Sequence, residues 1–162
     1  MAEGVFRSLT SHHTTRTNTS STSAHPLVGE VDSCGTGAYH VGDAPDPRTL
    51  AVLSNHGITS THYSHSARKF RTEDLKDFDY IFAMDSENLF YLTNAKSRAI
   101  NKGIVREDEA AKVMLFGAFG GKKSEEVGDP YYGGRDGFDV AYEQVERFSK
   151  GFIKYLENGE KK

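Results

Sequence analysis

The chain has 162 residues, of which 27% are charged and 36% are apolar, and its formal net charge at pH 7 is −3. This length predicts one domain, with a core large enough to fold without disulfide bonds. The slightly negative charge excludes the basic footprint of a nucleic-acid-binding protein and a polybasic membrane patch, so we expect neither kind of partner.

The N-terminal segment has the pattern of an amphipathic helix, with four apolar residues on one face: Ala2, Val5, Phe6 and Leu9. No capping residue precedes its first turn, so we expect the sequence to begin inside this helix and not at the helix's natural start. Residues 8–24 are rich in Ser and Thr, and we expect a mobile loop there. His12 and His13 lie in that loop without a neighbouring carboxylate or cysteine, so we expect no metal site.

Three segments predict strands: 29–33, 80–84 and 112–117. The second and third are almost unbroken apolar runs. Such runs are typical of strands that are covered on both faces, as in the middle of a parallel sheet.

Four helical segments flank these strands: 47–56, 72–77, 86–102 and 138–155. Asp46 and Pro47 are suited to begin the first, and Asp85 or Ser86 can cap the third. The last carries apolar residues at alternating three- and four-residue steps, typical of core packing. Alternating strands and helices predict an α/β domain with a parallel sheet, whose ligands lie at the carboxyl ends of the strands. We expect residues 159–162 to be a flexible tail.

Five sequence blocks resemble the low-molecular-weight protein tyrosine phosphatases, in that family's order: residues 32–42, 45–48, 65–68, 83–89 and 129–133. Residues 1–6 are similar to part of the family's first helix, so the resemblance, which is to members of the fungal type, extends over nearly the whole chain. It implies a single domain over residues 1–162 with a three-layer, flavodoxin-like α/β fold. In the family a first, central strand and a C-x5-R-S-P loop directly precede that helix. We expect both to be missing from this chain.

The resemblance implies a phosphoric monoester hydrolase that cleaves phosphotyrosine and small aryl phosphates through a phosphocysteine intermediate. It also implies phosphotyrosine proteins as partners, no cofactor, and a monomer if the chain folds. The missing loop carries the nucleophilic cysteine and the phosphate-binding arginine, so we expect no nucleophile and no activity in the chain as printed. The alternative is a noncatalytic interaction protein that acts through its Asp-Pro-Tyr-Tyr surface. Related arsenate reductases need several cysteines, which excludes their chemistry here.

The same match suggests site residues. Asp129 matches the general acid and base, although Asp129-Pro130 alone would indicate only a turn. Ser33 and His65 match residues that hold the nucleophile loop by hydrogen bonds, and without that loop a local structural role describes them better. Three aromatic residues match the walls of the substrate cleft, although each alone would indicate ordinary packing: Tyr39, Tyr131 and Tyr132.

Cys34 is the only cysteine, and Cys34-x5-His40 superficially resembles the missing loop. We expect Cys34 not to be the nucleophile. A histidine cannot offer phosphate the planar pair of N–H donors that an arginine does, and no helix starts after Cys34. A small, partly buried apolar side chain is the better interpretation. A single cysteine excludes an intramolecular disulfide, and the N-terminus lacks the apolar run of a signal peptide, so we expect a cytoplasmic protein.

Overall fold

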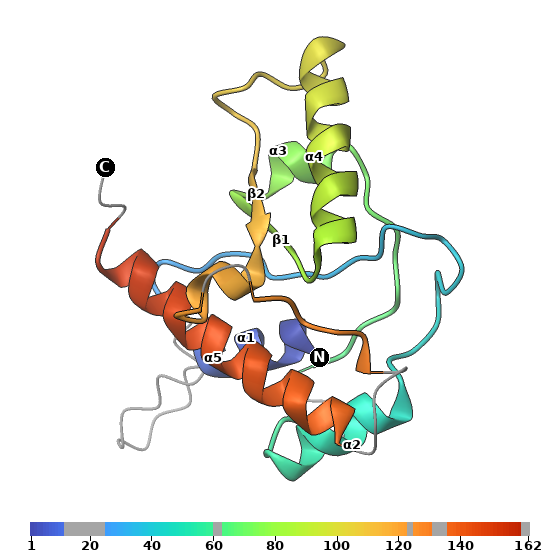
Figure 1. Ribbon diagram of the computed structural model, residues 1–162, viewed down its shortest axis with the longest axis vertical. Helices are drawn as coiled ribbons and strands as arrows, with labels where there is room; N and C mark the ends of the chain where they lie inside the picture. The colour runs from blue at the N-terminus through green and yellow to red at the C-terminus, as the bar shows by residue number, and fades with distance from the viewer. Residues whose placement is uncertain (12–24, 60–62, 123–124, 131–135, 160–162) are drawn as a thin grey trace.

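The computed structural model describes residues 1–11, 25–59, 63–122, 125–130 and 136–159. Two strands lie between two groups of helices (Figure 1). One group contains α1 (Ala2–Ser11), α2 (Pro47–Asn55) and α5 (Gly137–Glu157). The other contains α3 (Asp74–Asp77) and α4 (Ser86–Asn101). A separate cluster of buried apolar side chains fills the space on each side of the strands, which gives three layers.

The described sheet consists of β1 (Tyr80–Ala83) and β2 (Lys112–Leu115), which run parallel with Tyr80 opposite Lys112. The parallel α/β arrangement confirms the class predicted from the alternation of elements. A short 3-10 helix, η1 (Phe116–Phe119), follows β2 directly, so this strand ends earlier than expected.

The prediction of a strand over residues 29–33 is wrong. This segment forms no ladder with any described residue, and the nearest pairing is a single parallel bridge between Gly35 and Lys69. A strand needs a neighbour for its backbone groups. Here a side chain takes part of that role, because the guanidinium of Arg7 donates to the carbonyl of Val31 at 2.6 Å and 3.2 Å.

The two strands are less buried than their apolar composition predicts. Along β1 only Ala83 is fully buried, and no residue of β2 is. Side chains of β1 still alternate as expected, because Tyr80 and Phe82 pack against the α5 side and Ile81 and Ala83 against the α4 side. Among the described residues, each strand pairs with one neighbouring strand.

Helix boundaries follow the predicted signals closely. Asp46 accepts a hydrogen bond from the backbone N–H of Arg48 at the start of α2, and Asp85 accepts one from Asn88 at 2.7 Å at the start of α4. Gly103 ends α4 in the left-handed conformation, at φ 67°.

Helix α1 is longer than predicted and takes in residues 8–11, which were expected to belong to the Ser/Thr-rich loop. Thr10 fits the last turn because its hydroxyl donates to the carbonyl of Phe6 at 2.9 Å. The rest of the predicted loop, 12–24, and residues 160–162 of the predicted tail lie outside the described residues.

Gly151 allows α5 to pack closely on η1. A Cβ atom at this position would come within 3.0 Å of the carbonyl carbon of Phe119 and closer still to its oxygen. We expect Gly151→Ala to lower the free energy of unfolding by about 1–3 kcal/mol, although alanine favours helices by about 1 kcal/mol over glycine. Urea unfolding measures this change. Equal or greater stability of the variant would show that η1 moves aside without cost.

Candidate active site

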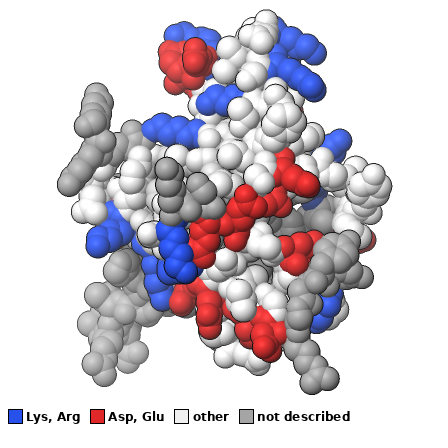
Figure 2. Space-filling model, viewed as in Figure 1, with Lys and Arg blue, Asp and Glu red and all other residues white. Residues whose placement is uncertain are grey.

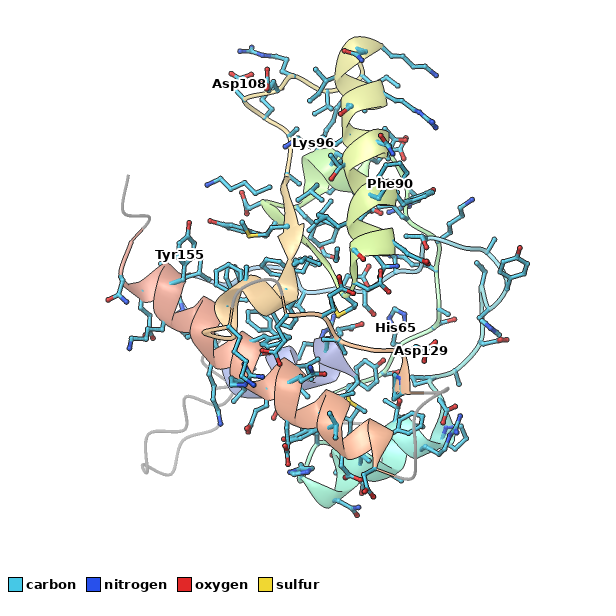
Figure 3. All side chains as sticks on the ribbon, in the orientation of Figure 1. His65, Phe90, Lys96, Asp108, Asp129 and Tyr155 are labelled. Atoms are coloured by element: carbon cyan, nitrogen blue, oxygen red, sulfur yellow. The ribbon has the colours of Figure 1, made fainter. Side chains whose placement is uncertain are left out.

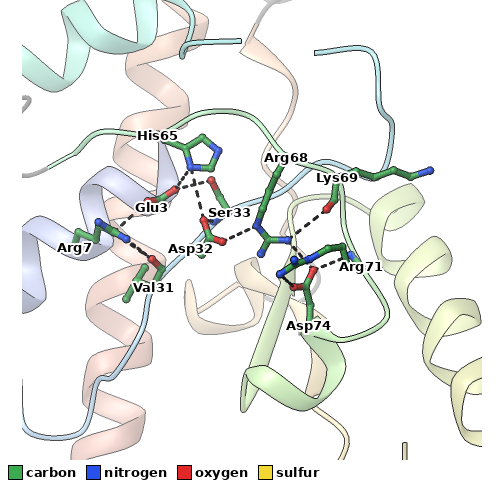
Figure 4. A network of polar contacts seen from close by, with 10 residues as sticks. All are labelled: Glu3, Arg7, Val31, Asp32, Ser33, His65, Arg68, Lys69, Arg71 and Asp74. Atoms are coloured by element: carbon green, nitrogen blue, oxygen red, sulfur yellow. Dashed lines mark hydrogen bonds and ion pairs between the residues drawn. The ribbon is translucent and has the colours of Figure 1, made fainter. Parts of the chain in front are cut away.

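Glu3 is the centre of a buried polar network at the start of α1 (Figure 4). Its side chain is 2% exposed and carries three contacts. The hydroxyl of Ser33 donates to its carboxylate at 2.7 Å, Nδ1 of His65 lies 3.0 Å from it, and Nε of Arg7 lies 3.1 Å from it. The predicted pair Ser33 and His65 is therefore brought together by a third residue that both contact.

A second group of charges adjoins this network through Asp32. Nδ1 of His65 lies 3.7 Å from Asp32, and Nε of Arg68 donates to the same carboxylate at 2.6 Å. Arg68 also donates to Asp74, which is 3% exposed, at 2.8 Å. The backbone N–H of Arg71 adds a further bond to Asp74 at 2.8 Å. Arg68 thus joins the segment that contains Ser33 to α3.

These contacts change the acidity of two groups. Desolvation acts to raise the pKa of Asp32, but hydrogen bonds from Arg68 and from the N–H of Ser33 outweigh it and hold that pKa below its ordinary value. Burial and the nearby carboxylate of Glu3 raise the pKa of Tyr63 to about 12. Tyr63 lies next to His65, with ring centroids 6.2 Å apart. Asp32 therefore stays charged and Tyr63 stays protonated at neutral pH.

Among the described residues, one group has the composition of a metal-binding site: Glu3, Asp32 and His65, with one potential ligand atom from each within 4.8 Å of the others. Both carboxylates already pair with guanidinium groups, Glu3 with Arg7 and Asp32 with Arg68. A metal ion would have to compete with both cations, so the arrangement is better suited to hold backbone segments together.

The other predicted site residues come from other segments of the chain. Asp129 is exposed and belongs to the segment that joins η1 to α5, whereas His65 belongs to the segment between α2 and α3 (Figure 3). Tyr39 is 95% exposed. Tyr131 and Tyr132 lie outside the described residues. The substrate cleft expected from these residues therefore stays a prediction.

Cys34 is exposed, so the expectation of a partly buried side chain is wrong. It directly follows the segment that was expected to be a strand and has no sheet to cover it. Desolvation of the thiol nevertheless raises the pKa of Cys34, and the attraction of Arg68 is outweighed. A thiol with a raised pKa is the opposite of an activated nucleophile.

Sequence reasoning missed five members of the network: Glu3, Arg7, Asp32, Arg68 and Asp74. Three of them, Glu3, Asp32 and Arg68, lie within sequence segments on which the family resemblance rests, so the resemblance could have indicated them. No local pattern indicated Arg7 or Asp74, because charged residues on short helices are ordinarily solvated.

Acidic side chains gather in a band across the middle of the face drawn in Figure 2, and basic side chains lie mostly around it. This face has no continuous basic surface. Among the described residues, no helix combines the length and apolar character that crossing a membrane requires.

Comparison with known proteins identifies the family. The family model described as low molecular weight phosphotyrosine protein phosphatase matches residues 1–162. The chain belongs to this family. A low molecular weight phosphotyrosine protein phosphatase of Schizosaccharomyces pombe is 46% identical to it over 157 residues, which cover 96% of this chain and 87% of the relative. The Rattus norvegicus phosphatase of the same description is 35% identical over 154 residues, which cover 95% and 85%.

Solved structures of phosphatases have the same fold. A Drosophila arginine phosphatase superposes with a TM-score of 0.75 at 28% identity, covering 96% of this chain and 88% of that one. A protein tyrosine phosphatase of Entamoeba histolytica superposes with a TM-score of 0.73 at 28% identity, covering 98% and 87%. The fold class expected from the low-molecular-weight phosphatase resemblance is thereby confirmed.

Proposed function

We propose that this protein is a phosphotyrosine phosphatase of the low-molecular-weight class, and that its 162-residue chain by itself does not catalyse the reaction. The supporting observation is chemical. The sequence contains one cysteine, and the sixth residue after it is His40 rather than an arginine. Attack on phosphorus needs a thiolate, and the phosphate oxygens need an arginine fork beside it.

The proposed reaction has two steps. A thiolate of the C-x5-R-S-P type attacks phosphorus, and the bond to the phenolic oxygen breaks while the Asp129 carboxyl gives that oxygen its proton. Water then attacks the phosphocysteine, the Asp129 carboxylate takes a proton from the water, and the S–P bond breaks to release phosphate and the thiolate. Asp129 is thus the part of this machinery that the chain itself supplies.

The polar network supports the same proposal. Glu3 lies in the first turn of α1 and contacts Ser33 and His65, so a loop that leads into α1 would lie beside both side chains. Their role would be to fix the shape of such a loop by hydrogen bonds. Phosphotyrosine proteins are the proposed substrates, and a reducing compartment such as the cytoplasm is the proposed location, since a thiolate enzyme needs a reduced cysteine.

Two forms of the protein test this proposal. The chain as printed should not release phosphate from phenyl phosphate above the buffer rate. The same chain with a family member's apolar strand and C-x5-R-S-P loop joined before Met1 should hydrolyse phenyl phosphate, and acid quench should trap phosphate on its loop cysteine. Genomic DNA upstream of Met1 should encode such a strand and loop.

Three results would count against the proposal. A joined chain that folds and remains inactive would contradict the phosphatase function. Turnover by the printed chain that disappears in Cys34→Ser would identify Cys34 as a nucleophile. Upstream DNA without a strand and loop would favour a protein that does not act as an enzyme.

A further inference from the structure

Phe90 is an exposed aromatic residue that the packing of α4 does not explain. It is 72% exposed, more than any other large apolar residue of this helix. By contrast, Leu92 is buried, and the ring of Tyr91 packs edge-on with that of Phe70 at a centroid distance of 6.2 Å. Single exposed apolar side chains are common on protein surfaces, so the place of Phe90 decides whether it has a role.

This residue lies near the edge of the sheet at which ligands of parallel α/β folds bind. Helix α4 begins at Ser86, just after the carboxyl end of β1. Phe90 follows one helical turn later on the same face as Ser86, about 6 Å along the helix axis. Figure 3 shows Phe90 in the half of α4 that lies nearer to His65 and Asp129. An exposed ring therefore stands beside the expected binding edge.

The segment that carries Asp129 is fixed to the same edge. The backbone N–H of Val127 donates to the carbonyl of Met84 at 2.8 Å. Asp129 follows two residues later, so it lies within about 7 Å of Val127. The two branches of chain that lead to Asp129 and to Phe90 thus start at Met84. An extended peptide advances about 3.3 Å per residue, so residues two to four positions from a phosphotyrosine held at Asp129 can reach Phe90.

Residues 65–70 connect the polar network to the same part of α4. The N–H of Phe70 donates to the carbonyl of Gly35 at 2.9 Å, and its ring contacts Tyr91, the neighbour of Phe90. The large apolar side chain of this segment, that of Phe70, is buried. Phe90 and Tyr91, which is 39% exposed, therefore supply apolar contact for a peptide that crosses this segment.

We propose that Phe90 is a specificity-determining residue, which contacts an apolar side chain of a phosphotyrosine peptide two to four residues from the phosphotyrosine. The inference rests on the proposed phosphatase function and assigns it a substrate class, peptides with an apolar residue at that place. Contact between the two side chains removes apolar surface of both from water, which favours binding. Phenyl phosphate has no such extension, so its hydrolysis does not report on this contact.

The test uses the chain with the joined strand and C-x5-R-S-P loop. In the parent peptide, four glycine or serine residues flank phosphotyrosine on each side. Six derivatives carry one leucine at the second, third or fourth position before or after it. Leucine at one or two adjacent positions should raise kcat/KM about fivefold over the parent, mainly by lowering KM. Phe90→Ala should remove this preference, whereas the matched control Ile104→Ala should keep it, because Ile104 is 45% exposed but follows the opposite end of α4.

The possible results separate this inference from the phosphatase function. Hydrolysis of every peptide without a preference for leucine, or a preference that Phe90→Ala retains, would overturn the role of Phe90 and leave the phosphatase function standing. An equal loss of preference in Ile104→Ala would also overturn it, because the effect would then not be local to Phe90. A joined chain that folds but hydrolyses neither the peptides nor phenyl phosphate would overturn the phosphatase function and this inference with it.

Discussion

Replacing Asp129 by Asn should lower kcat for phenyl phosphate about 10²- to 10⁴-fold in the chain that carries the joined strand and C-x5-R-S-P loop. An amide cannot give a proton to the leaving phenolic oxygen or take one from the attacking water. Phosphate release under steady-state conditions measures this loss. The exposed position of Asp129 is compatible with access of both substrate and water.

Leaving-group dependence separates an acid catalyst from a residue that only shapes a turn. p-Nitrophenol leaves readily without a proton, so Asp129→Asn should slow cleavage of p-nitrophenyl phosphate less than cleavage of phenyl phosphate. Asp136 provides a matched control, because it is exposed and its side chain makes no capping hydrogen bond to α5. If Asp129→Asn and Asp136→Asn lose activity equally, Asp129 is not the acid.

Local signals predicted most elements correctly because they concern neighbouring residues. The cap at Asp85 and the glycine at position 103 each act within one helical turn. The long apolar stripe of α5 predicts a helix wherever one face of it is buried, whatever it packs against. Such features depend little on the rest of the chain, so the sequence predicts them well.

The segment 29–33 could not be predicted in the same way, because a strand depends on a partner that may lie anywhere in the chain. Only Val31 in this segment is a residue that strongly favours strands. The described structure provides no neighbouring strand for a ladder, and the carbonyl of Val31 accepts hydrogen bonds from Arg7 instead. β-propensity describes how well a residue fits a half-buried sheet surface, and it cannot supply the surface.

In the candidate site, too, some features could be predicted from the sequence and others depend on how distant segments pack. The family blocks indicated Ser33 and His65 as site residues, but the contact that they share, the buried carboxylate of Glu3, depends on the packing of α1 against residues 31–33. The sequence pattern did not indicate Asp74, because nothing in a four-residue helix predicts which carboxylate of that helix is buried. In the structure Asp74 is buried and accepts a hydrogen bond from Arg68.

Arg68→Met should lower the free energy of unfolding at pH 7 by about 2–4 kcal/mol, because it leaves Asp74 buried without its main ion-pair partner. Asp74 is 3% exposed, and among the described residues one of its oxygens accepts no hydrogen bond even with Arg68 present. Urea unfolding provides the measurement. Arg106→Met is the matched control, since Arg106 and Asp108 are 70% and 67% exposed, and it should change stability by less than about 0.5 kcal/mol.

Dependence on pH tests whether the loss is electrostatic. Arg68 helps to hold the pKa of Asp32 below its unfolded value of about 3.9. The stability that this pair contributes is therefore complete above that value and disappears as the pH falls through the lower, folded-state pKa. The difference between wild type and Arg68→Met should be the same at pH 7 and pH 5 and should narrow toward pH 3. A difference that stays constant down to pH 3 would mean that Arg68 stabilises the fold through the packing of its side chain, with little contribution from its charge.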